Sequence, residues 1–254
     1  MSSANKYCKE LASQFGLTPI YLPGTDINPG DVIRFSEHNL LGFPKPIGTF
    51  TKTTSLANYN CFIEIERNDN PRSYYFSSKK GISISFNAEV KGDSSKIGHL
   101  KIDFSMVGAT YVAALGCVEE RIKDISKLET QLSLKKEQLD WSQHFIVLSV
   151  IRAGKALAVQ SNDKKTCIEI TGDVSALAKT DPDCSPQISL KTSSFSGSAM
   201  YMDWTENAPI FFRLLRYRKK LLRDWGIQHG KFGSPYPIGD FSLLEVDSSE
   251  IIDD

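Results

Sequence analysis

Apolar and polar residues alternate through two neighbouring stretches, which predicts two strands that each carry one apolar face. The first stretch has its apolar positions at Ile82, Ile84, Phe86, Ala88 and Val90. The second follows the turn-like sequence Gly92-Asp93-Ser94-Ser95 and has its apolar positions at Leu100, Ile102, Phe104 and Met106. We expect the two strands to form a hairpin, with a helix that begins near Phe104 as the competing interpretation of its end.

Similar patterns on both sides of this hairpin predict further strands. We expect them at residues 31–35, 61–66, 144–152, 155–161, 166–172, 187–192 and 199–204. Residues 144–152 are apolar on both faces, so that strand should be central. Residues 209–225 are typical of a final strand that enters a helix.

Helical spacing of apolar residues occurs in two regions. The first covers residues 5–15, where Tyr7, Leu11 and Phe15 share one face and Gly16 provides a stop. The second covers residues 108–139, which predict one long helix or two consecutive ones, and the uncharged residues 104–118 within this part of the chain indicate a buried helix. Strands on both sides of a helical middle, without regular βαβ alternation, favour an α+β fold.

Composition describes a globular chain without a global electrostatic signature. Of 254 residues, 41% are hydrophobic and 24% are charged, which excludes wholesale disorder. Thirty basic and 30 acidic residues give a formal net charge of +0, so nothing global indicates a nucleic-acid partner. The five cysteines are scattered without a CxxC pair, which favours a reducing compartment.

The sequence contains no strong catalytic signature. HExxH, GxSxG, a complete phosphate-binding loop and a GxGxxG fingerprint are all absent. The four histidines are isolated from one another and from acidic pairs at ligand spacing. We therefore expect no enzyme activity, no cofactor and no metal site.

The end of the chain differs in charge from the rest. Residues 226–240 are rich in glycine and proline and predict a flexible, protease-sensitive connector between residues 1–225 and a short tail at 241–254. Residues 231–254 hold one basic and six acidic residues, a net charge of −5, which leaves +5 on residues 1–230. A basic stretch precedes the connector and comprises Arg213, Arg216, Arg218, Lys219, Lys220 and Arg223.

Five segments, taken in order, resemble the bacterial gasdermins, a family of pore-forming cell-death proteins. They are LTPIYLPGTDINPGDVIRF (17–35), PKPIGTF (44–50), SSKIGHLKIDFSMVGATYVAALG (94–116), HFIVLSVIRAGKALAVQS (144–161) and APIFFRLLRYRKKL (208–221). The resemblance covers most of the chain in order. It is a similarity of pattern, since no catalytic motif marks the family.

The resemblance implies a twisted, mainly antiparallel central sheet surrounded by helices and an inhibitory C-terminal tail. It further implies a resting monomer in the cytoplasm, activated when a caspase-like or other protease removes the tail. The released body then inserts hairpins into the inner membrane and oligomerises into a large pore, which causes cell death in antiphage defence. Cys8 matches the position of a cysteine that carries a palmitate in this family.

Three groups of residues receive roles from this interpretation. The membrane-inserting strands use Ile82, Ile84, Phe86, Val90, Leu100, Ile102 and Phe104. The basic residues of 213–223 contact lipid, since a cationic surface gains about 1 kcal/mol per Lys or Arg near an anionic leaflet. The inhibitory tail packs through Phe241, Leu243, Leu244, Val246, Ile251 and Ile252.

Each assignment has a simpler alternative. The alternating strands fit an ordinary half-exposed sheet, Cys8 fits a packed core cysteine, and the tail fits a solvated acidic terminus. The main rival function is a non-lytic interaction module that docks a protein partner through residues 213–223 or the tail. An unrecognised hydrolase is the third possibility.

Overall fold

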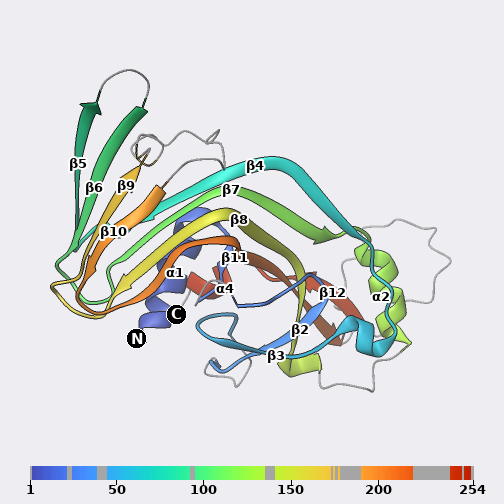
Figure 1. Cartoon of the computed structure of the whole chain (residues 1–254). Helices are drawn as coiled ribbons and strands as arrows, with labels where there is room; N and C mark the ends of the chain where they lie inside the picture. Colours follow the sequence, from blue (N-terminus) through green and yellow to red (C-terminus); the bar gives the residue numbers. More distant parts are fainter. Residues whose placement is uncertain are drawn as a thin grey trace, which may run out of the picture.

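The computed structural model describes residues 2–21, 25–38, 45–91, 95–134, 141–172, 174, 177, 190–219, 241–247 and 249–252. Within these ranges the molecule is built mainly from antiparallel strands in two sheets (Figure 1). The helices are α1 (Ser3–Phe15), α2 (Ile125–Ser133) and α4 (Ser249–Ile252), with short 3-10 turns at Leu56–Tyr59 and Trp141–Gln143. The expected ring of helices around the sheet is not seen in the described part of the chain.

The larger sheet has eight strands and forms the arch that crosses Figure 1. Its strands are β1 (Thr18–Pro19), β2 (Asp31–Phe35), β3 (Phe50–Ser55), β4 (Ile65–Ser77), β7 (Thr110–Ile122), β8 (Phe145–Ser161), β11 (Ala199–Lys219) and β12 (Phe241–Glu245). Strand β8 lies at its centre, with β11 along one edge and β7 and β2 along the other. Strand β4 pairs with β7 on one side of the arch.

The smaller sheet has four strands in the order β10-β9-β6-β5. Its strands are β5 (Ile82–Lys91), β6 (Ser95–Phe104), β9 (Cys167–Gly172) and β10 (Leu190–Ser196). Ile102 on β6 and Ile168 on β9 are fully buried against Leu157 and Val159 of the larger sheet. The two sheets therefore share one hydrophobic core.

Residues 110–122 form a strand, so the expectation of helix over residues 108–139 was wrong for this part, and so was the buried helix expected at 104–118. Val112 and Ala114 face the core beneath α1, whereas Tyr111, Ala113 and Leu115 face the core between the two sheets. A strand that is buried on both faces needs apolar residues at successive positions, which removes the period of two. The helix that does form, α2, begins only after the N-cap Asp124, whose side chain accepts from the Lys127 amide.

The strand expected at 61–66 begins only at Ile65 and continues to Ser77, so that expectation was wrong for residues 61–64. Several other expectations agree with the structure. The strand at 31–35 and the hairpin arms are present, and β6 ends at Phe104 without a helix. Helix α1 ends at Gly16, which has φ 64° and donates its amide to the carbonyl of Ala12. Strands expected at 144–152 and 155–161 form one continuous strand, and the strand expected at 199–204 continues to Lys219. The helix expected at the end of 209–225 lies outside the described residues.

Candidate functional site

Strands of the two sheets that follow one another in the chain stand in the same order in both sheets. Four neighbouring strands of the larger sheet, β4-β7-β8-β11, connect directly to the four strands of the smaller sheet, β5-β6-β9-β10, in matching order. Each connection is a short turn, at residues 78–81, 105–109, 162–166 and 197–198. We call these four turns the crease. They gather at the lower left of Figure 1, where one four-stranded ribbon folds back on itself.

Hydrogen bonds join the four turns to one another. The Gly108 amide donates to the Ser161 carbonyl at 2.7 Å, and the Ser105 amide donates to the Gly81 carbonyl at 2.9 Å. The Asn162 amide donates to the Ser198 carbonyl at 2.8 Å. The crease is therefore a bonded unit, so opening one turn disturbs its neighbours.

The Asp163 carboxylate holds the two turns on the β8 and β11 side together. It accepts from the Ser198 amide at 2.8 Å, from the Lys165 amide at 2.8 Å and from the Thr166 hydroxyl at 2.9 Å. These bonds, the Lys165 amide first, favour the ionised carboxylate and lower the pKa of Asp163. The negative charge of Asp163 is thus directed at these two turns.

Two crease glycines adopt the left-handed conformation in different surroundings. Gly197 has φ +94°, and a Cβ there would lie 2.6 Å from the Thr166 Cα. Gly108 has φ +74°, and a Cβ there would meet only the flexible Lys6 side chain, at 3.1 Å. The bend at Gly197 therefore excludes a side chain in the folded-back state, whereas a straight strand would accept one.

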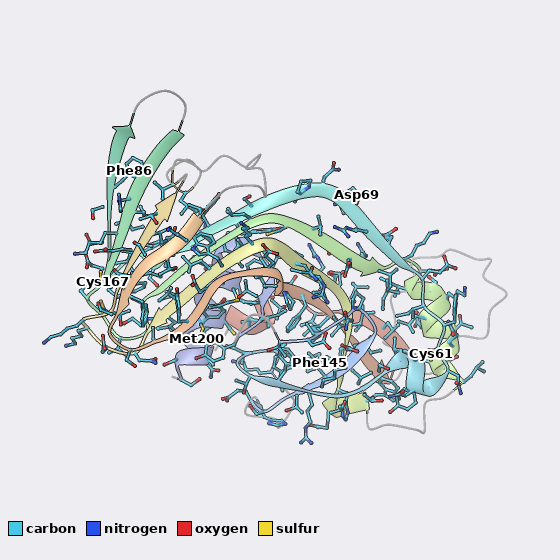
Figure 2. All side chains as sticks on the ribbon, in the orientation of Figure 1. Cys61, Asp69, Phe86, Phe145, Cys167 and Met200 are labelled. Carbon is cyan, nitrogen blue, oxygen red and sulfur yellow. The ribbon has the colours of Figure 1, made fainter. Side chains whose placement is uncertain are left out.

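The residues expected to face lipid share one face of the smaller sheet. Ile82, Ile84 and Phe86 on β5 pair in register with Phe104, Ile102 and Leu100 on β6. The β6 residues are buried in the core between the sheets, whereas Ile84 on the edge strand is 47% exposed. Figure 2 shows Phe86 on the part of the hairpin that lies away from the crease. The side chain of Val90 lies outside the described residues.

The tail forms the strand β12 on the edge of β11. Its backbone pairs from Leu215 with Glu245 to Lys219 with Phe241, and the Val246 amide donates to the Leu214 carbonyl at 2.9 Å. Val246 is buried, Leu243 packs partly against a core cluster, and Leu244 is 50% exposed. The side chains of Phe241 and Ile252 lie outside the described residues. The tail therefore covers a sheet edge as well as apolar surface.

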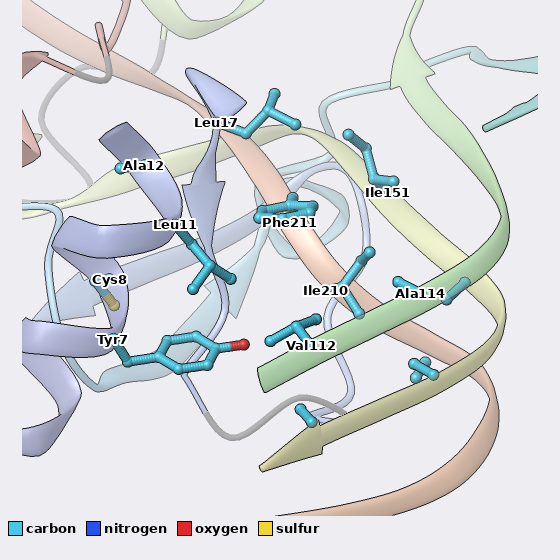
Figure 3. Close-up of a cluster of buried hydrophobic side chains, with 14 of the residues drawn as sticks. Tyr7, Cys8, Leu11, Ala12, Leu17, Val112, Ala114, Ile151, Ile210 and Phe211 are labelled. Carbon is cyan, nitrogen blue, oxygen red and sulfur yellow. The ribbon is translucent and has the colours of Figure 1, made fainter. Parts of the chain in front are cut away.

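The last helix joins the tail to α1. Ile251 on α4 is completely buried in the cluster that contains Tyr7, Cys8 and Leu11 of α1. Figure 3 shows Tyr7 and Leu11 extending from α1 within that cluster. The tail is therefore anchored at two places, the β11 edge and α1.

Helix α1 in turn contacts the crease. The Ser78 hydroxyl donates to the Glu10 carboxylate at 2.6 Å, and the Thr110 amide donates to the Ser78 Oγ at 2.9 Å. The Lys6 ammonium lies 3.5 Å from the Val107 carbonyl and 3.9 Å from the Glu10 carboxylate. Because α4 packs on α1, these contacts connect the tail with the turns.

Two residues of the basic stretch are engaged within the protein itself. Arg213 lies 3.2 Å from the Glu245 carboxylate of the tail and 3.4 Å from Glu119 of β7. Arg216 is buried, with its guanidinium 4.7 Å from the ring centroid of Phe145. The side chains of Arg218 and Lys219, and the whole of Lys220 and Arg223, lie outside the described residues. With the tail in place, Arg213 is paired with carboxylates and Arg216 is buried.

Cys8 is a buried core residue of α1. Its thiol lies 4.0 Å from the Pro19 carbonyl, and burial raises the pKa of Cys8 to about 12. A protonated, buried thiol is a poor nucleophile, so acylation would require α1 to move or the chain to be modified before it folds. The palmitate on Cys8 stays a prediction.

The described residues contain no other clear chemical centre. Within these ranges no group of three His, Cys, Asp or Glu residues could hold a metal ion. Among the described helices, none has the length and apolar character needed to cross a membrane. Sequence reasoning missed the crease, although Gly81 precedes the alternating run at 82–90, Gly108 follows the one at 100–106 and Gly197 precedes the strand expected at 199–204, so these glycines could have marked its turns.

Comparison with known proteins gives little additional information. No protein-family model and no curated protein matches the sequence. Among solved structures, the gasdermin A3 membrane pore aligns over 95% of this chain and 94% of that chain, with 8% sequence identity and a TM-score of 0.39. A similarity this low supports no conclusion about family or function.

Proposed function

We propose that this protein is an autoinhibited, gasdermin-type pore-forming protein that is activated when a protease removes its C-terminal tail. The observation that carries this proposal is the crease. Because strand order is the same on both sides, straightening the four turns would preserve every pairing between neighbouring strands. The result would be one four-stranded sheet in which β4 continues into β5 and β6 into β7.

The dimensions of that sheet suit a membrane. Strands β5 and β6 each contain 10 residues, and a tilted transmembrane strand needs about 9–11. Their apolar face carries Ile84, Phe86 and Ile102, and lipid could cover this face in place of the protein core that buries its β6 residues in the resting form. The opposite face carries Ser83, Ser85 and Lys101, which suits contact with water.

The edges of the larger sheet favour self-assembly after cleavage. Among the described strands, β4 pairs only with β7, so its other edge is open, whereas the outer edge of β11 carries β1 and β12. Loss of β12 would expose the backbone of residues 215–219. Since β4 and β11 run antiparallel to each other, the β11 edge of one copy could pair with the β4 edge of the next. Such a head-to-tail contact forms a closed ring when its rotation closes.

The tail holds the resting state through contacts that depend on its covalent link. Burial of Val246 and Ile251 contributes about 1.5–3 kcal/mol each, and the entropy of ordering the segment opposes much of that gain. Cleavage in residues 226–240 removes the high effective concentration of the tail, so the severed peptide should dissociate. We propose that the opened body inserts into the inner membrane and kills the cell, as in antiphage defence.

The test is dye release from vesicles that contain anionic lipid. A recognition sequence for a specific protease is placed in residues 226–240, and leakage is compared before and after cleavage. We expect leakage only from the cleaved protein. The matched control is the unmodified chain treated with the same protease. If the cleaved and intact proteins are both inert, the pore-forming proposal fails and a non-lytic interaction module becomes the better interpretation.

A further inference from the structure

The crease presents a group of exposed lysines at one corner of the molecule. Lys79 and Lys80 lie in the turn between β4 and β5, and Lys164 and Lys165 lie in the turn between β8 and β9. All four side chains are exposed. The bonds between the turns hold these two segments in one unit, so lysines that are 84 residues or more apart in sequence lie at the same corner.

One acidic residue, Asp163, lies within the crease, and its hydrogen bonds direct its charge toward the turns rather than toward solvent. Asp163 is the one carboxylate in the four turns, and it accepts three hydrogen bonds from Lys165, Thr166 and Ser198. Four lysines against one aspartate leave the turns with a net charge of +3. The corner is thus cationic although the whole chain has a net charge of +0.

Two apolar side chains project from the same corner. Met106 is 43% exposed and Val107 is 52% exposed, in the turn between β6 and β7. Exposed apolar residues beside lysines match the interface of a bilayer, where side chains of this kind reach below the headgroups while ammonium groups stay among the phosphates. An isolated exposed residue needs no explanation, but an adjacent pair in the same four turns as four exposed lysines is a specific arrangement.

These exposures occur while the tail is in place. Strand β12 lies on residues 215–219 of β11, and α4 lies on α1, so neither covers Lys79, Lys164 or Val107. By contrast, Arg213 belongs to the basic stretch that was predicted to contact lipid, and it is paired with Glu245 of the tail. The crease is therefore available to a membrane before any cleavage.

We propose that the crease is a docking surface for anionic lipid and that the intact, uncleaved protein already binds membranes through it. This inference names the lipid partner of the proposed pore former and rests on that proposal for its purpose, but binding itself does not require pore formation. Docking would place the turns at the headgroups, with β5 and β6 connected directly to them. Cleavage would then act on a protein that is already on its target.

The experiment measures binding of the intact chain to vesicles by co-sedimentation. One set of vesicles contains phosphatidylglycerol with phosphatidylcholine, and the other contains phosphatidylcholine alone. We expect binding to the anionic set only. At about fivefold per lysine, Lys79→Gln with Lys164→Gln should weaken that binding about 25-fold. Val107→Ser should weaken it further without changing its dependence on salt.

The matched control is Lys123→Gln with Lys127→Gln, which removes the same charge beside α2, at the opposite end of the arch in Figure 1. This control should bind as the unmodified chain does. Equal losses in both double variants would mean a nonspecific charge effect and would overturn the proposal. No binding by the intact chain would also overturn it, as expected if the corner instead meets an acidic protein. Binding that appears only after cleavage would reject docking by the resting form and leave the proposed pore function intact.

Discussion

The substitution Ile251→Ala should release the tail without a protease. Ile251 of α4 is completely buried and belongs to the cluster that contains Leu11 of α1. Truncating a buried isoleucine to alanine costs about 2–5 kcal/mol, which corresponds to a roughly 30-fold to several-thousand-fold increase in the detached fraction. Because the tail is held marginally, a shift of this size should give measurable activity.

The assay combines dye release from anionic vesicles with growth of cells that express the variant. We expect uncleaved Ile251→Ala to cause leakage and to slow growth, while its circular dichroism spectrum stays like that of the unmodified chain. Leu244→Ala is the matched control, because Leu244 lies in the same tail but is 50% exposed, and it should remain inert. Leu243→Asp should act in the same direction as Ile251→Ala, since Leu243 packs partly against the core. Sensitivity to proteolysis shows whether the tail of the folded Ile251→Ala variant is detached. If the tail is detached and the variant is still inert, the tail does not inhibit the protein.

Three further predictions concern the strands, the crease and the cysteine. Ile84→Asp should fold, because this edge residue is 47% exposed. It should abolish leakage after cleavage, since an acidic side chain facing lipid is unfavourable. Leakage at the normal rate would show that this hairpin is not part of the pore. Gly197→Ala should lower the melting temperature more than Gly108→Ala, because only its Cβ meets backbone, and equal melting temperatures would contradict the crease geometry. Cys8→Ala should weaken pore formation without unfolding the body; an unmodified intact mass of the native protein together with full activity of the variant would end the palmitate hypothesis.

The parts of the fold that sequence predicts well are those with one exposed face. Ile84 and Ile102 alternate with polar neighbours because one side of each strand faces away from the core, and the hairpin was predicted from that alternation. Residues 110–117 have no such alternation because both faces are buried, so a strand was mistaken for a helix. Periodicity carries information only when the two sides of an element differ in environment.

The candidate site was predicted in part, for a related reason. Apolar residues in the tail indicated an inhibitory contact, but only the pairing with β11 reveals that Leu244 is exposed while Val246 and Ile251 are buried. The basic stretch was predicted to contact lipid, yet a charge count cannot show that Arg213 pairs with Glu119 and Glu245. The crease joins residues that are far apart in sequence, so its cooperative bonding was not accessible from local pattern.

The most direct test of the proposed straightening is a measurement of the distance between β4 and β5 across the crease. Spin labels are placed at Arg72→Cys and Ser85→Cys, both exposed positions, with Cys167 and Cys184 changed to serine. Cys8, Cys61 and Cys117 are buried, so their labelling should be slow, and an unsubstituted sample measures any background. Straightening the turn would place both sites on one continuous strand, 13 residues or about 43 Å apart. We expect a shorter distance in the intact protein and a shift to about 43 Å when the cleaved protein is bound to anionic vesicles. An unchanged distance in a sample that permeabilises those vesicles would contradict the proposed straightening.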